Sequence, residues 1–266
     1  MKKTKVLAVL FACVLLLVMV MPVGAVTDGD PDGEGHPYVG IMTMTDSEGR
    51  WRCSGTLISP TVFLTAGHCT YGAIGDVQVW FATDIDAGRP GNGYPTTGEA
   101  SGTAYTHPDY DPNAFFLHDV GVVVLHTAVA KDTYGALPDY DQLDAFKTQR
   151  GKQDVTFTAV GYGLQKSFPD AAAWKDVANR VRMVAYPKLN QINVPGYTGD
   201  FSMVLSNNAS TGGTCFGDSG GPNFLGDSNV VAGVTSFGKN GNCAGTGGVF
   251  RMDRASALDW VNTFLE

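Results

Sequence analysis

Short apolar runs, each about the length of one β-strand and bounded by turn-forming residues, constrain the fold of this chain most. They are rich in β-branched and aromatic residues, which favour strands. The 34 glycines among 266 residues supply many of the turns between them. The runs do not alternate with long helical patterns, so a parallel α/β sheet is excluded and an all-β protein is predicted. The runs are Val39–Thr45, Gly55–Ser59, Val62–Ala66, Val77–Ala82, Val120–His126, Val155–Val160, Val181–Tyr186, Phe201–Leu205, Val230–Thr235 and Gly248–Met252.

Near the C-terminus the spacing of apolar residues differs from that of the strand-like runs. Apolar residues recur there at helical spacing, which predicts a C-terminal helix over residues 254–265 with Asp253 as its N-cap. A shorter helix is predicted near Ala171–Val177. Residues 127–150 are polar and turn-rich, as expected of a connection between two halves.

The first 25 residues follow the plan of a secretory signal peptide. Three lysines precede an apolar run from Val6 to Met21, and the small residues Gly24 and Ala25 suit a cleavage site. We expect cleavage after Ala25, with Val26 as the new N-terminus and no membrane attachment afterwards. The alternatives are an uncleaved anchor or a lipoprotein site at Cys13. The expected localisation is extracellular.

Four cysteines follow this leader. An even number in an exported chain predicts two disulfides, and three pairings are possible. Pairing sequence neighbours would close two short loops. The spacing does not resemble a zinc site, so neither a metal nor a cofactor is expected. The net charge of −8 argues against nucleic acid as a partner. The four are Cys53, Cys69, Cys215 and Cys243.

Three motifs bring together the groups needed for acyl transfer. A strand ends at His68 in Leu64–Cys69, and Asp119 immediately precedes the apolar strand Val120–Leu125. Ser219 lies in the glycine-rich segment Gly213–Pro222. A serine hydroxyl is a weak nucleophile until a base removes its proton, and a buried carboxylate can orient a histidine for that task. Backbone N–H groups that converge in a turn stabilise an oxyanion.

These motifs resemble those of the chymotrypsin/trypsin-like serine proteases, and the resemblance runs from Val26 to Glu266. It implies two antiparallel six-stranded β-barrels, over about 26–140 and 141–252, followed by the C-terminal helix. His68 would be the general base, Asp119 would orient it and Ser219 would be the nucleophile. The N–H groups of Gly217 and Ser219 would form the oxyanion hole. The implied disulfides are Cys53–Cys69 and Cys215–Cys243.

The resemblance also implies a substrate-binding region. The base of the primary specificity pocket would be Gly213, with Thr214 beside it and no charge to select arginine or lysine. An open, uncharged pocket favours cleavage after large apolar or aromatic residues. Lys239 near the entrance could instead favour an acidic side chain. The pocket walls and the strand that pairs with the substrate backbone would come from Ser236, Phe237, Gly238 and Gly248.

The resemblance also implies an ion pair that forms when the enzyme is activated. In the family, a new N-terminal amine pairs with the aspartate before the nucleophile, here Val26 with Asp218. Removal of the signal peptide alone would then mature the enzyme.

The expected function is thus a secreted serine endopeptidase acting on polypeptides. It is expected to be a monomer and a target of protein protease inhibitors. The alternatives are a non-catalytic binding module on the same fold, or an esterase.

Overall fold

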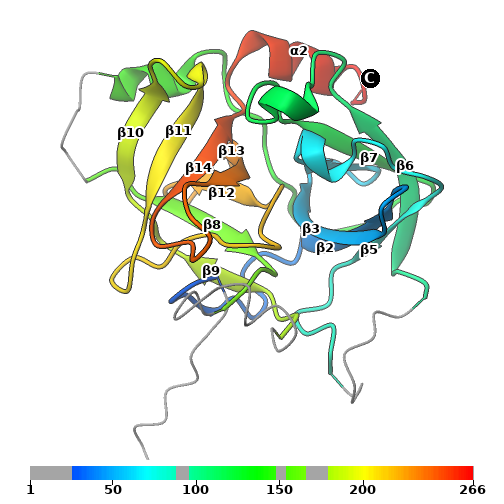
Figure 1. Cartoon of the computed structure of the whole chain (residues 1–266). Coiled ribbons are helices and arrows are strands. Elements are labelled where there is room, and N and C mark those ends of the chain that lie inside the picture. Colours follow the sequence, from blue (N-terminus) through cyan, green and yellow to red (C-terminus); the bar gives the residue numbers. More distant parts are fainter. Residues whose placement is uncertain (1–25, 88–95, 148–153, 166–178, 266) are drawn as a thin grey trace, which may run out of the picture.

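The computed structural model describes residues 26–87, 96–147, 154–165 and 179–265 (Figure 1). The expected signal peptide over residues 1–25 and the expected helix near 171–177 lie outside these residues. The strands are β1 (Asp30–Pro31), β2 (Val39–Thr45), β3 (Arg50–Leu57), β4 (Val62–Thr65), β5 (Val77–Trp80), β6 (Ala100–Thr106), β7 (Gly121–Leu125), β8 (Phe157–Gly161), β9 (Met183–Ala185), β10 (Leu189–Val194), β11 (Gly199–Asn207), β12 (Pro222–Leu225), β13 (Val231–Gly238) and β14 (Gly245–Arg251). The helical elements are the 3₁₀ turns η1 (Gly67–Cys69), η2 (Pro112–Ala114) and η3 (Gln142–Phe146) and the α-helix α2 (Ala255–Asn262).

The first half is a closed antiparallel barrel. Its strand order is β2-β3-β4-β7-β6-β5, and β5 pairs back onto β2. The apolar strand β7 is held between β4 and β6. Strand β6 was not predicted, because its small and polar residues lack an apolar run. The barrel requires it nonetheless, since it joins β5 to β7.

The second half is an eight-stranded antiparallel sheet in the order β1-β9-β8-β12-β13-β14-β11-β10. The predicted mostly-β fold is confirmed, but this half differs from the expected six-stranded barrel because no ladder among its described strands closes it. Strands β8 and β10 approach only through a single bridge between Thr156 and Lys188. The neighbouring Pro187 accepts a hydrogen bond from the Phe157 N–H but has no N–H of its own, so the ladder cannot continue there. Figure 1 shows the two halves side by side.

The C-terminal helix is confirmed over Ala255–Asn262, which is shorter than predicted. The prediction that Asp253 caps it was wrong: the N-cap is Arg254, and its side chain makes no capping hydrogen bond. Asp253 is fully buried instead, where it binds the guanidinium of Arg251 at 2.7 and 2.9 Å and accepts from the Leu143 N–H. A buried guanidinium competes more strongly for this carboxylate than a helix N-terminus does.

Candidate active site

A buried carboxylate holds the imidazole of His68. Asp119 lies directly before β7 and is fully buried. Its Oδ1 accepts the backbone N–H of His68 at 2.9 Å, and its Oδ2 lies 2.9 Å from His68 Nδ1. Because an ionised carboxylate only accepts, Nδ1 carries the proton in this contact. The other ring nitrogen, Nε2, is then free to act as a base when the ring is neutral.

Ser236 provides a further contact to this carboxylate. Its hydroxyl donates to Asp119 Oδ2 at 2.6 Å across the two halves of the molecule. The sequence pattern suggested Ser236 only as part of a substrate-pairing strand. No local signal marks its side-chain role, because the two residues are 117 positions apart.

Two opposed effects set the pKa of His68. Burial lowers it, because a charged ring loses solvation, whereas the charge and hydrogen bond of Asp119 raise it. The balance is a raised pKa. The imidazolium that forms when His68 accepts a proton is therefore stabilised by its own partner.

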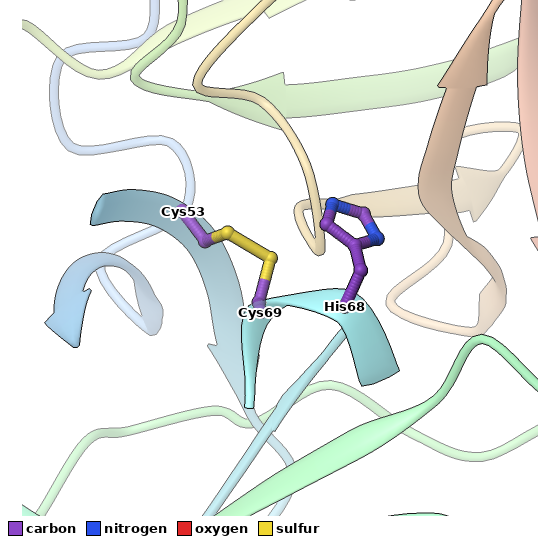
Figure 2. A group of neighbouring side chains, drawn as sticks. All are labelled: Cys53, His68 and Cys69. Carbon is purple, nitrogen blue, oxygen red and sulfur yellow. A yellow bond between two sulfur atoms is a disulfide. The ribbon is translucent and has the colours of Figure 1, made fainter. Parts of the chain in front are cut away.

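A disulfide fixes the turn that carries His68. Cys69 in η1 is bonded to Cys53 in β3, with 6.1 Å between their Cα atoms. In Figure 2 the disulfide runs from Cys69 across to Cys53, and the imidazole lies on the other side of Cys69, so the bond holds the backbone without covering the ring. The second disulfide joins Cys215 to Cys243. Both bonds match the pairing that the family resemblance implies.

The loop that carries Ser219 is pressed against this first half. The Ser54 N–H donates to the carbonyl of Ser219 at 2.8 Å, and the Ser54 hydroxyl donates to the carbonyl of Gly217 at 2.9 Å. A Cβ atom on Gly220 would lie 2.0 Å from the Thr65 hydroxyl oxygen, so only glycine fits this approach. The loop therefore lies beside the end of β4, just before His68. In this structure no hydrogen bond joins the Ser219 hydroxyl to His68, both of which lie in the described residues.

Several backbone N–H groups in this loop make no hydrogen bond within the described residues, those of Thr214 and Phe216 included. Among the described residues, those of Gly217 and Ser219 donate no hydrogen bond, whereas Asp218, Gly220 and Gly221 donate to Cys215, Thr235 and Asp218 respectively. Gly217 has φ = 96°, a conformation that glycine adopts without strain. Of the free donors, those of Gly217 and Ser219 are the pair expected for an oxyanion hole.

Asp218 is fully buried behind this loop. Its carboxylate accepts the N–H groups of Gly163 at 2.7 Å and Cys215 at 2.9 Å. Burial raises its pKa to about 7 in spite of these bonds and the nearby charge of Arg52. Val26 is also fully buried, and the next residue, Thr27, accepts the Gly213 N–H at 3.0 Å. In the full-length chain the Val26 nitrogen is an uncharged amide.

The residues expected to form the specificity pocket differ in what surrounds them. Gly248 faces the ring of Phe237, 2.3 Å from where its Cβ would lie, so this glycine makes room for Phe237. The glycine opposite Thr214 is Gly247, whose Cβ would lie 3.0 Å from the threonine hydroxyl oxygen. Sequence reasoning missed Gly247, although the Gly247-Gly248 pair was visible. A Cβ atom on Gly238 would meet only the backbone carbonyl oxygen of Asn240, at an ordinary contact distance of 3.6 Å.

Comparisons with known proteins identify the family of this chain. The family model described as Trypsin matches residues 27–261. Serine protease 1 of Drosophila melanogaster is 31% identical over 246 residues, covering 90% of this chain and 84% of that protein. Chymotrypsin-C of Bos taurus is 27% identical, covering 90% and 88%. A solved structure of HL collagenase shares the fold, with a TM-score of 0.68 at 23% identity over 89% of this chain and 97% of that one. The chain therefore belongs to the trypsin family of serine proteases and is a serine endopeptidase.

Proposed function

We propose that this endopeptidase cleaves polypeptides through a triad of His68, Asp119 and Ser219. The observation that carries the proposal is the contact between Asp119 and His68 Nδ1 at 2.9 Å, which holds the ring in the tautomer that a general base needs. The unused N–H groups of Gly217 and Ser219 support it independently.

The reaction then follows from the geometry. Ser219 Oγ bonds to the scissile carbonyl carbon as its proton passes to His68 Nε2. The carbonyl oxygen becomes an oxyanion, which the N–H groups of Gly217 and Ser219 stabilise. The C–N bond breaks, and His68 returns the proton to the leaving amine. Water, activated by the same imidazole, then hydrolyses the acyl-enzyme.

Large apolar or aromatic side chains are the proposed preference before the scissile bond. The proposed pocket base at Gly213 and Thr214 carries no charge. Phe116, Tyr197 and Phe237 form an apolar cluster, with 4.4 Å between the stacked rings of Phe116 and Tyr197. Lys239 is exposed, as a solvated loop residue would be.

Export is proposed to mature the enzyme. Residues 1–25 would act as the signal peptide, leaving the protease domain 26–266 with its two halves near 26–140 and 141–252. The new Val26 amine would pair with Asp218. The buried position of Val26 supports this, because its side chain already packs against Met183 and Ala185. None of the helices in the described ranges has the length and apolar character needed to cross a bilayer. N-terminal sequencing of the secreted protein tests the proposal, and a start well beyond Val26 would refute it.

The deciding experiment compares peptide and small-ester hydrolysis by the protein that begins at Val26 and by its Ser219→Ala variant. Peptide cleavage that Ser219→Ala abolishes supports the triad. Ester cleavage without peptide cleavage would indicate an esterase, and binding without either would indicate a non-catalytic module. Light scattering tests the proposed monomer, and inhibition by protein protease inhibitors tests the remaining proposed partner class.

A further inference from the structure

A buried amide stands where the pocket base lacks a side chain. A Cβ atom on Gly213 would lie 2.3 Å from Cγ of Asn207 and 2.5 Å from its Oδ1. Asn207 is the last residue of β11 and is 1% exposed. The Asn207 side chain thus occupies the space in which a side chain at Gly213 would begin. The base of the proposed pocket is therefore filled by a side chain from strand β11.

The hydrogen bonding of Asn207 fixes the direction of its amide. Its Nδ2 donates to the backbone carbonyl of Thr214 at 2.7 Å. A carbonyl only accepts, so the NH₂ group must lie on that side and the oxygen on the other. Asn207 Oδ1 is buried and has no hydrogen-bond partner among the residues that the structure describes. A buried acceptor without a partner is unfavourable and requires an explanation.

The groups beside this oxygen are uncharged. Gly213 lies against it, and the Thr214 carbonyl binds the NH₂ group of the same amide. The Thr214 hydroxyl lies towards Gly247, 3.0 Å from where a Cβ on that glycine would be. An uncharged base with one free acceptor differs from an anionic base. It pairs with a neutral donor and provides no ion pair for arginine or lysine.

We propose that Asn207 is a specificity-determining residue at the base of the primary pocket, where Oδ1 accepts a hydrogen bond from a neutral donor at the tip of the substrate side chain. Tyrosine is then preferred over phenylalanine before the scissile bond. The two side chains bury the same ring, but only tyrosine pairs the free acceptor. A site built to bond a substrate hydroxyl discriminates strongly against the analogue that lacks it. This inference rests on the proposed function.

The test uses two peptides that differ only in tyrosine or phenylalanine before the scissile bond. The expected kcat/KM ratio favours tyrosine at least fivefold in the wild-type protein. Asn207→Leu keeps a similar shape without the acceptor, so the ratio should fall towards one, mainly through slower tyrosine cleavage. Asn208→Leu is the matched control, because Asn208 is the next residue and is exposed. It should keep the wild-type ratio.

A wild-type ratio below fivefold overturns the inference, and so does an unchanged ratio in folded Asn207→Leu. If near-UV circular dichroism shows that Asn207→Leu is unfolded, Asn207→Asp replaces it. A carboxylate at the pocket base should add cleavage after lysine or arginine, and no gain in a folded variant overturns the inference. If neither variant folds, the wild-type ratio decides.

Labelling with a serine-directed fluorophosphonate separates the two levels of the argument. If Ser219 is not labelled and neither peptide is cleaved, the proposed function fails and this inference falls with it. Labelling without cleavage of either peptide overturns the tyrosine preference alone. Cleavage of both peptides at equal rates overturns only the role of Asn207.

Discussion

At the residue scale, the balance of forces on His68 gives a pH prediction. A base must be unprotonated to act, so kcat/KM should fall as the pH drops through the raised pKa of His68. Asp119→Asn removes the effect that raises this pKa and leaves burial, which lowers it. The midpoint of the acid limb should therefore move to lower pH, and kcat should fall by about 10⁴. The measurement is kcat/KM against pH, with the exposed Asp109→Asn as control. An unchanged midpoint in Asp119→Asn would contradict the role of this carboxylate.

Single residues also mark where prediction from sequence ends. Asp119 was predicted because it directly precedes an apolar strand, a local pattern that indicates a buried carboxylate. The contact from Ser236 and the position of Asn207 could not be predicted. Each depends on strands from distant parts of the sequence meeting in space, and neither leaves a local pattern. The contact between Gly248 and the Phe237 ring could not be predicted for the same reason.

At the scale of elements, the buried pair of Arg251 and Asp253 joins β14 to η3 and to the start of α2. Arg251 is fully buried and also binds Asp144 at 2.8 Å. Asp253→Ala would leave a buried guanidinium short of its main partner, so the free energy of unfolding should fall by about 3 kcal/mol. Urea denaturation measures this, and kcat of the folded fraction should stay near wild type. Asp259→Ala is the matched control, because Asp259 is exposed on α2. Equal losses in both variants would contradict the assignment.

The disulfide Cys53–Cys69 is a second stabilising link between elements, because it joins η1 to β3. It closes a loop of 16 residues, which corresponds to about 3 kcal/mol in the chain-entropy description. Replacing both cysteines by alanine should lower the free energy of unfolding by roughly this amount. It should also lower kcat, because η1 is no longer bonded to β3. Thermal unfolding and peptide hydrolysis measure the two effects. Undiminished kcat in the folded double variant would mean that the Asp119 contact alone positions His68.

Whole strands and helices were predictable where apolar residues recur at a single spacing, either that of a strand or that of a helix. Strands such as β7 and the helix α2 follow from apolar patterns that are complete in themselves. Strand β6 was missed because Ala100–Thr106 mixes small, polar and aromatic residues, and its place is set by its neighbours in the barrel. The open second sheet was also beyond local reasoning. Closure of the sheet depends on the backbone hydrogen bonds that Pro187 and Lys188 can form with the start of β8.

At the scale of the whole molecule, the proposed site exists only where the two halves meet. The first half contributes His68 and Asp119, and the second contributes Ser219 and Ser236. Ser54 links them, because its hydroxyl donates to Gly217 and also accepts the Tyr162 N–H at 3.0 Å. The proposed oxyanion donors Gly217 and Ser219 therefore depend on contacts between the halves as well as within the second half. Any process that alters the packing of the second half should therefore change the position of these N–H groups.

The proposed maturation at Val26 would be such a process, and the titration of Asp218 makes its effect measurable. In a chain extended beyond Val26, the pKa of Asp218 is raised from 3.8 to about 7. The folded state then binds this proton more tightly than the unfolded state, so stability should fall between about pH 4 and pH 7. From pH 5 to 7 the loss should be roughly 2–3 kcal/mol. A protein beginning at Val26 should escape it, because its amine would hold the carboxylate ionised.

The experiment measures urea unfolding at pH 5 and pH 7 for a protein that begins at Val26 and for one extended by Ala25. The extended protein should lose more stability at pH 7, and Asp218→Asn should remove that excess loss. His68 also loses stabilising protonation as the pH rises through its raised pKa, but it is present in every protein compared, so the difference isolates Asp218. Equal pH dependence with and without the extension would show that the Val26 amine does not reach Asp218. The proposed pairing of the new N-terminus with Asp218 would then be refuted.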